Sequence, residues 1–180
     1  IYTLSLHDAL PIYFRVIFDE YPDQLQIRLM CNRIYDKVKE AENSEDNLVK
    51  DMFRYAGYND TSWNIGDISD WDTSNVITMN RTFQGAGHSS DGFNFDLSGW
   101  DTSSVTNMDY MFSELSVKTL DISSFNNENA TTSYMFYKTT KLEEITVGKN
   151  WIWNDDGLLP DGGWRNVETE EIYASDEIPD

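Results

Sequence analysis

Apolar and polar residues follow two spacings within each stretch of about 24 to 30 residues in the middle of the chain. In residues 95–98 and 120–123 they alternate, which predicts a half-buried strand. Farther along, apolar residues recur at spacings of three and four, which predicts a second apolar segment leading into a helical turn. In one stretch these residues are Val105, Met108, Met111 and Phe112. The intervening residues 101–103, Asp-Thr-Ser, predict a tight turn or a helix start, because such side chains bond nearby backbone amides.

This pattern is repeated along the chain. Residues 67–79 (DISDWDTSNVITM) return as residues 96–108 (DLSGWDTSSVTNM) and, with more changes, as residues 121–132 (DISSFNNENATT). A unit of this length cannot bury its apolar side alone, so successive units must stack. The sequence therefore predicts an α/β repeat solenoid, in which short strands stack into a narrow sheet with turns and helical turns behind it. We expect function on the stacked surface rather than in an enzyme cleft.

The repeats divide the chain into parts. A phenylalanine closes each unit, which places three repeats at 54–83, 84–112 and 113–136. The third departs most, because Phe125 replaces the tryptophan and Asn-Asn-Glu replaces Asp-Thr-Ser. Such changes are typical of a terminal repeat, whose outer face has no neighbour. We expect an N-terminal strand and helical cap before the repeats and a C-terminal cap and tail after them, over residues 13–53 and 137–180.

The N-terminal region holds two further expectations. Residues 1–12 resemble the translation of sequencing-adapter read-through, and we exclude them from the fold as an artefact. The chain is then a fragment of a longer protein whose natural N-terminus is missing. Within the cap, an amphipathic helix is predicted to cover the first repeat, with partner binding as its alternative role. The single cysteine, Cys31, lies on its apolar face, which predicts a buried structural thiol.

The first two repeats carry an insertion that the third lacks, at residues 56–63 and 86–93. Its Gly, Asn, Asp and Ser content predicts a loop that leaves the repeat and returns at an aromatic anchor, Trp63 or Phe93. His88 stands in this loop where the first repeat has Tyr58, so we expect a variable loop residue there.

The repeat pattern L-D-L-S-x-W-D-T-S-x-V-T-x-M-x-x-M-F resembles the bacterial BspA-like leucine-rich-repeat surface proteins. The resemblance covers residues 52–151, and residues 163–175 are similar to the segment that follows such repeats. It implies a leucine-rich-repeat-like solenoid on a secreted or cell-surface bacterial protein, with adhesion as its activity. The repeat consensus does not encode the partner, which we expect to be a protein of a host or neighbouring cell surface, or a carbohydrate.

Charge and hydropathy narrow the range of partners. The net charge is −19, which disfavours nucleic acid and anionic membranes through repulsion and favours basic surfaces or cations. The mean hydropathy is −0.55 and the sequence has no long apolar run, so no transmembrane span is expected.

Catalytic chemistry has little support in the sequence. His88 is the one histidine outside residues 1–12, which leaves no histidine pair for zinc and no evident base for a nucleophile. We therefore expect no enzyme and no cofactor. The leading function is a protein-binding or adhesion module, with a structural spacer or display stalk as the alternative and a fragment of a carbohydrate-active enzyme as the third candidate.

A column of acids is the strongest electrostatic feature. If the repeats stack in register, Asp67, Asp96 and Asp121 lie on adjacent strands roughly 5 Å apart, where like charges repel. Water, backbone amides and the nearby serines are the favoured compensation. The alternative is calcium, since carboxylate oxygens suit a hard divalent cation.

Aromatic residues form a second column, Trp71, Trp100 and Phe125, which we expect in the core. An exposed aromatic platform is the alternative. The candidate binding surface consists of Trp63, Trp151 and Trp153, and their exposure would separate a binding module from a spacer.

Overall fold

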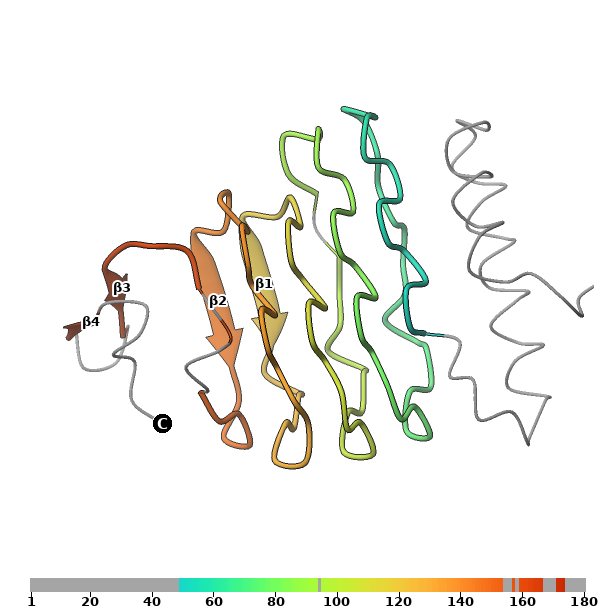
Figure 1. Cartoon of the computed structure of the whole chain (residues 1–180), viewed down its shortest axis with the longest axis vertical. Coiled ribbons are helices and arrows are strands. Elements are labelled where there is room, and N and C mark those ends of the chain that lie inside the picture. The colour runs from blue at the N-terminus through green and yellow to red at the C-terminus, as the bar shows by residue number, and fades with distance from the viewer. Residues whose placement is uncertain (1–48, 94, 154–156, 158, 167–170, 174–180) are drawn as a thin grey trace, which may run out of the picture.

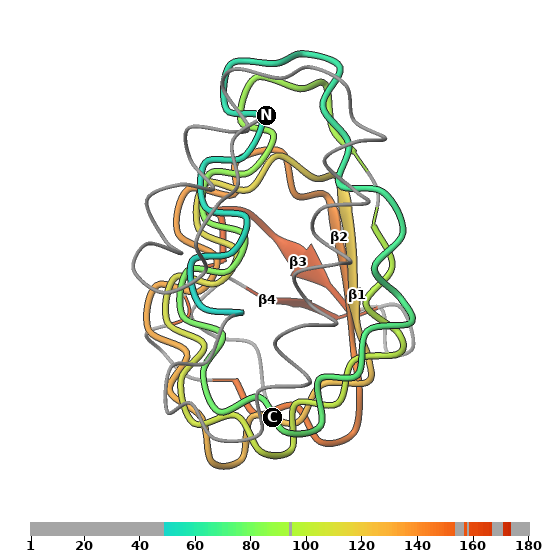
Figure 2. The same ribbon diagram turned by 90° about the vertical axis from the view of Figure 1, so that its right-hand side faces the viewer.

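The computed structural model describes residues 49–93, 95–153, 157, 159–166 and 171–173. Residues 1–12 and residues 13–48 of the predicted N-terminal cap lie outside the described residues. Residues 49–53, which were also assigned to the cap, form turns of the first described coil. Within them the chain winds into successive coils that stand side by side (Figure 1). Viewed along the stack, the coils superpose around a common interior (Figure 2). No helix among these residues is long and apolar enough to cross a membrane.

Two pairs of short strands occur towards the C-terminal end. Strands β1 (Thr119–Ile122) and β2 (Glu144–Val147) pair in parallel, with Leu120 opposite Ile145. Strands β3 (Trp164–Arg165) and β4 (Ile172–Tyr173) form an antiparallel pair. The strand predicted at 120–123 is thus confirmed as β1. The equivalent residues 95–98 do not form a strand, although Leu97 is buried as the alternation predicts.

The opposite side of each coil is a series of turns that bond to the next coil. Alternate backbone N–H groups donate across the stack, and those between them donate to a carbonyl three residues back. In the first described coil the cross-stack bonds join Asp51 to Asn80, Phe53 to Thr82 and Tyr55 to Gln84, at 3.1, 2.8 and 2.7 Å. The same pattern joins residues 79–85 to 107–113 and residues 108–114 to 131–137. This series replaces the helical turn expected from the sequence.

The apolar spacing explains why a helix was predicted. In the turns, Met108, Met111, Phe112 and Leu115 are buried. Met108 and Phe112 are four positions apart, and so are Met111 and Leu115, so burial recurs with a period of four. Over eight residues a period of four is hard to tell from the 3.6 residues of a helix. We call the residues two and three positions before, and one and two positions after, Phe53, Phe83, Phe112 and Phe136 the turn face. It comprises residues 50–51, 54–55, 80–81, 84–85, 109–110, 113–114, 133–134 and 137–138.

The period of four requires an unusual backbone. Every non-glycine residue with positive φ in the described chain lies on the turn face, with φ between 56° and 58°. Asp51, Arg81, Tyr110 and Tyr134 each come two positions before one of the phenylalanines 53, 83, 112 and 136. Tyr55, Glu114 and Lys138 come two positions after Phe53, Phe112 and Phe136. The left-handed conformation costs an L-residue about 1 to 2 kcal/mol, and glycine avoids this cost. Gly85 is the one glycine at these positions.

Aromatic rings stack from coil to coil inside. Phe53, Phe83, Phe112 and Phe136 follow one another at centroid distances of 5.4, 5.8 and 5.9 Å, with nearly parallel planes. Ile68, Leu97 and Ile122 are buried, as predicted for equivalent positions, and so are Met79 and Met108. Because Phe53 and β2 both belong to the stack, the coils extend beyond the limits 54–136 expected from the repeats.

Polar links reinforce the stack at the turns after the aromatic column. The hydroxyl of Thr102 donates to the carbonyl of Asn126 at 3.0 Å and accepts from the N–H of Asn126 at 2.8 Å. Thr73 is bonded to Asp101 in the same way. Asn127 replaces the threonine in the third repeat, and its amide makes the same pair of bonds to Ile152, at 2.7 and 2.8 Å. The departure from Asp-Thr-Ser therefore preserves the link.

The insertions return at aromatic anchors, as predicted. Trp63 and Phe93 are both buried and meet edge to face at 4.8 Å. The ring of Trp63 occupies the place of a side chain at Gly57, where an added Cβ would lie 1.9 Å from Cγ of the tryptophan. Glycine is therefore required at Gly57 by both its positive φ and its close contact.

We predict that Leu97→Ala destabilises the protein by about 2 to 5 kcal/mol, the usual cost of truncating a buried leucine. Leu97 is 1% exposed, whereas Ile77 is 53% exposed and serves as the control. Ile77→Ala should change stability by no more than about 0.5 kcal/mol. Urea unfolding measures both, and a loss below about 1 kcal/mol for Leu97→Ala would show that this position is not central to the core.

The turn face provides a second test. Glu114→Gly should be more stable than Glu114→Ala by about 0.5 to 1 kcal/mol, because only alanine retains the left-handed strain. At Thr119, which is exposed in β1, the alanine variant should instead be more stable than the glycine variant, since glycine loses more chain entropy in a strand. Thermal unfolding of the four variants measures both differences. If the alanine variant were the more stable one at both Glu114 and Thr119, the backbone at Glu114 would not be strained as the structure indicates.

Candidate binding surface

The aromatic residues expected on a binding surface are mostly in the core. Trp63 is 6% exposed and Trp151 is 7% exposed, so these two candidate binding residues are buried and do not form the open platform that was the alternative. Trp153 is partly buried and packs against Trp151 and Phe136, with centroids 5.7 and 6.4 Å away. These large rings fill the space between the coils, where burial removes most apolar surface from water.

The acid column is exposed, and each carboxylate bonds to its own chain. Oδ1 of Asp67, Asp96 and Asp121 accepts the backbone N–H of the serine two residues later, at 3.1, 2.8 and 2.9 Å. These contacts are the amide and serine contacts that the favoured interpretation of the sequence predicts. Among the described residues, no group of three His, Cys, Asp or Glu is placed to hold a metal ion. The column therefore forms a series of Asx turns.

A second acid column follows at the next corner of the coils. Asp72 and Asp101 accept the backbone N–H groups of Ser74 and Ser103 at 3.2 and 2.9 Å. Hydrogen bonds from Ser103 lower the pKa of Asp101, against smaller opposing effects of burial and Asp72. Hydrogen bonds from Ser98 likewise lower the pKa of Asp96.

The turn face holds an aromatic surface that the sequence analysis missed. We call Arg81, Tyr110, Tyr134, Tyr137 and Lys138 the tyrosine strip. The rings of Tyr110 and Tyr134 stack at 5.1 Å, and Tyr137 meets Tyr134 edge to face at 5.8 Å. The guanidinium of Arg81 lies 5.3 Å from the centroid of Tyr110, and Nζ of Lys138 lies 5.0 Å from that of Tyr137.

Neighbours cover the ring faces of Tyr110 and leave other parts of the strip open. Arg81 is in the coil before Tyr110 and Tyr134 is in the coil after, so Tyr110 has a partner on each face. Tyr134 and Tyr137 remain 44% and 37% exposed. The repeat alignment contained a signal for this strip, because Tyr110 and Tyr134 each precede a stacked phenylalanine by two residues.

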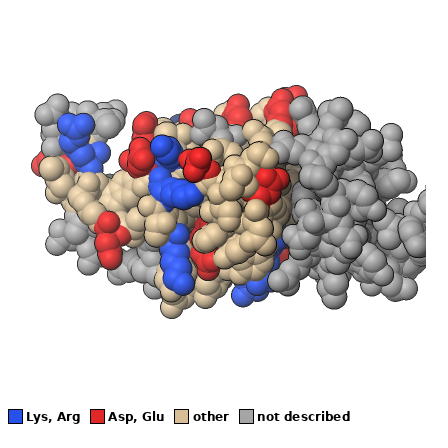
Figure 3. Space-filling model, turned by 90° about the horizontal axis from the view of Figure 1, so that it is seen from above, with Lys and Arg blue, Asp and Glu red and all other residues tan. Residues whose placement is uncertain are grey.

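Seen from above, acidic and basic side chains are interspersed on the surface that crosses the coils (Figure 3). The turn face has its own balance of charge. Its four basic residues are Lys50, Arg54, Arg81 and Lys138, and its three acidic residues are Asp51, Asp109 and Glu114. The excess of acidic residues that gives the net charge of −19 therefore lies outside the turn face.

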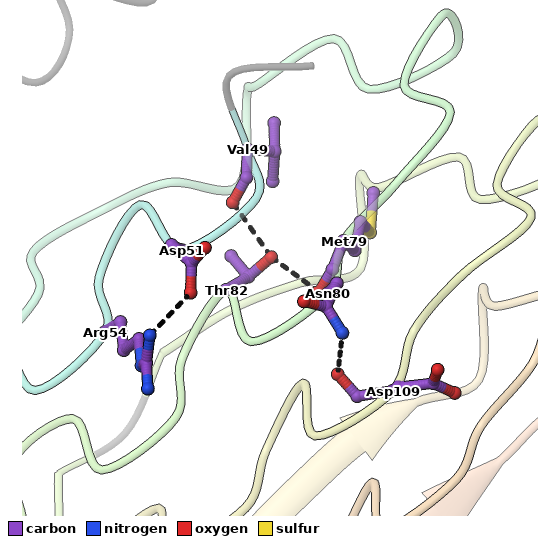
Figure 4. A network of polar contacts seen from close by, with 7 residues as sticks. All are labelled: Val49, Asp51, Arg54, Met79, Asn80, Thr82 and Asp109. Carbon is purple, nitrogen blue, oxygen red and sulfur yellow. Dashed lines mark hydrogen bonds and ion pairs between the residues drawn. The ribbon is translucent and has the colours of Figure 1, made fainter. Parts of the chain in front are cut away.

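Polar contacts hold the N-terminal part of the turn face in place. Arg54 Nη1 lies 3.4 Å from Asp51 Oδ1, and Asn80 Nδ2 donates to the carbonyl of Asp109 at 3.0 Å (Figure 4). The hydroxyl of Thr82 lies between the carbonyls of Val49 and Met79, at 2.9 and 2.8 Å.

Among the described residues, three buried polar atoms on the turn face have no hydrogen-bond partner: Arg54 Nε, Gln84 Oε1 and Ser113 Oγ. Gln84 and Ser113 occupy equivalent positions in adjacent coils, each directly after a stacked phenylalanine. Gln84 is 8% exposed and Ser113 is fully buried. A buried polar group without a hydrogen bond costs about 1 to 3 kcal/mol.

We predict that Asp96 and Asp101 make the protein sensitive to acid. Because the folded pKa of each lies below the ordinary 3.8, their stabilisation is complete above that value and is lost as the pH falls through the folded pKa. Asp96→Asn/Asp101→Asn should therefore unfold with a smaller pH dependence in this acid range than the parent. Urea midpoints across the range test this, with Asp91→Asn as an exposed loop control. Parallel curves for the parent and the double variant would contradict it.

Comparison with known proteins places the repeats in a family. Neither a curated protein nor a solved structure matches the chain significantly. The model of the DUF285 family, described as a Mycoplasma protein of unknown function, matches residues 31–153. The matched segment covers more than half of the chain and contains the stacked coils from Val49 to Trp153. The protein therefore belongs to the DUF285 family.

Proposed function

We propose that this protein is a non-catalytic module of the BspA-like leucine-rich-repeat type, a solenoid displayed outside a bacterial cell that binds a protein partner through its turn face. The observation that carries the proposal is the presence of seven strained, non-glycine residues on that face. Strained backbone of this kind clusters at functional sites, where the side chain is retained despite its cost.

Gly85 is the one glycine among the strained positions of the turn face. It occupies the position equivalent to Tyr55 and Glu114, and the ring of Tyr55 lies beside it, where an added Cβ would fall 2.3 Å from Cδ1 of the tyrosine. Glycine would relieve the left-handed strain at the other positions, yet the chain carries three tyrosines, an arginine, a lysine and two acids at them. The backbone does not require these side chains, which favours a role on the outside of the coils.

The composition of the turn face suits protein recognition. Tyrosine and arginine are enriched where protein interfaces concentrate their binding energy, and serine and asparagine supply adaptable hydrogen bonds. The face combines tyrosine and arginine with Asn80 and Ser133. Both faces of Tyr110 are occupied, so this ring offers no open face on which a sugar could stack.

The alternative is a structural spacer. A spacer needs only a uniform polar surface, repeated from coil to coil. The column two residues before the phenylalanines instead changes from Asp51 to Arg81, Tyr110 and Tyr134. This variation favours a binding face. A fragment of a carbohydrate-active enzyme is the third candidate, and no feature of the turn face favours it.

The proposal is tested by attachment of the purified protein to cells. Tyr134→Ser/Tyr137→Ser should reduce attachment to bacterial or host cell monolayers at least tenfold, a loss of about 1.4 kcal/mol and within the range of interface tyrosines. Ile172→Ser is the matched control, since Ile172 is 71% exposed and lies on β4 outside the turn face. Protease treatment of the cells should abolish attachment.

Three results would argue against the proposal. Attachment that survives protease but not glycosidase treatment would identify a carbohydrate partner. Equal attachment of the parent and the tyrosine variant would place binding elsewhere on the protein. No attachment to any cell type tested would favour the spacer.

A further inference from the structure

The described coils bury most of their readily oxidised side chains but leave tyrosines of the strip open. The described methionines are at most 6% exposed, and four of the six tryptophans are at most 7% exposed. Tyr134 and Tyr137 are 44% and 37% exposed. Because oxidation of a side chain follows its exposure, an oxidant in the solvent reaches these phenols before it reaches the sulfur atoms of the core.

Tyr110 and Tyr134 occupy equivalent positions in adjacent coils. Both have a left-handed backbone, with φ of 58° and 56°, which directs the two side chains alike. Their rings stack with centroids 5.1 Å apart and planes 8° apart. Corresponding atoms of the two rings are therefore separated by about the centroid distance, and the two hydroxyl groups lie at the same end of the stack.

We propose that Tyr110 and Tyr134 form a dityrosine cross-link under oxidising conditions, which joins the two coils covalently. The site is a modification site rather than a binding site. The inference goes beyond the proposed binding function and does not depend on a partner.

The cross-link requires a one-electron oxidant, such as a peroxidase supplied with hydrogen peroxide. Removal of one hydrogen atom from each phenol gives two phenoxyl radicals, whose unpaired electrons are shared with the ring carbons beside the hydroxyl. One such carbon of Tyr110 couples with one of Tyr134 to form a carbon–carbon bond. Each coupled carbon then passes its hydrogen to the phenol oxygen through solvent, which restores both aromatic rings. The pair loses two hydrogen atoms in total, and these reduce one hydrogen peroxide to two waters.

The stack between the coils favours this pair over radicals on different molecules. The backbone N–H of Tyr110 donates to the carbonyl of Ser133 at 3.0 Å, which fixes the two coils beside each other. Groups held in contact within one molecule react as if their concentration were very high. Rotation about the side-chain bonds of the two surface rings brings the coupling carbons from the stacked separation to bonding distance.

Tyr137 is the competing partner for Tyr134. Its ring lies 5.8 Å from that of Tyr134 but at 88°, so the edge of one ring meets the face of the other. The coupling carbons of the two rings are then not paired, as they are in the stack of Tyr110 and Tyr134. The stacked pair is therefore the expected site.

The position of the bond determines its effect on stability. A bond between Tyr110 and Tyr134 closes a loop the length of one coil, and such a loop restricts the unfolded chain as a disulfide does. A bond between Tyr134 and Tyr137 would close only a short segment within one coil. The proposed cross-link is thus a staple between coils.

The test oxidises dilute purified protein with a peroxidase and limiting hydrogen peroxide, and maps the monomer by proteolysis and mass spectrometry. A peptide pair that contains Tyr110 and Tyr134 and lacks two hydrogens should be the main cross-linked product. Tyr110→Phe should lower its yield at least tenfold, because phenylalanine keeps the stacked ring but has no phenol. Tyr58→Phe, in the first insertion, is the matched control and should leave the yield unchanged.

Thermal unfolding measures the effect of the staple. The cross-linked monomer should melt at least about 5 °C above the untreated protein, and treated Tyr110→Phe should melt with its own untreated form. Near-ultraviolet circular dichroism before oxidation checks that each variant folds.

Four results would overturn the inference: cross-links that map to Tyr134 and Tyr137, cross-links found only between molecules, no dityrosine at all, or an undiminished yield in Tyr110→Phe. A bond between Tyr110 and Tyr134 that leaves the melting temperature unchanged would overturn its role as a staple. Neither readout uses cells or a partner, so a failure here is distinguishable from a failure of the proposed binding function.

Discussion

The backbone hydrogen bonds between coils are the interaction on which the rest of the structure depends. On the turn side, alternate N–H groups donate across the stack, which holds each coil in register with the next. This register places the four phenylalanines above one another and aligns the aspartates at the two corners. It also aligns Tyr110 with Tyr134. A shift of one residue would move buried side chains to the surface in every coil at once.

The same hydrogen bonds account for the strain on the turn face. To direct alternate N–H groups into the next coil, the backbone adopts a left-handed conformation at every fourth residue. Glycine would meet this demand at lower cost, as it does at Gly85. The chain instead has tyrosine and charged residues at the equivalent positions. Their presence despite the backbone strain supports the binding role that we propose.

Charge is distributed unevenly around the coils. The corners carry the exposed aspartates, whose carboxylates bond to their own serines and so remain stable beside like charges. The turn face has balanced charge and the tyrosine strip.

The sequence by itself determined the repeat, the buried positions Ile68, Leu97 and Ile122, the turn chemistry of Asp101 and its serine, and the aromatic anchors of the insertions. Each of these depends on local chemistry or on a pattern that recurs in every unit. Only the tertiary structure decided whether Trp63 and Trp151 face solvent. A tryptophan side chain is stable both in the core and at the surface, so packing against the neighbouring coils determines its exposure. It also decided that the apolar spacing around Met111 belongs to turns with a period of four, since hydrogen bonds to the next coil replace those within a helix. The tyrosine strip depends on both, because its residues were visible in the repeats but became one surface only when the coils stacked.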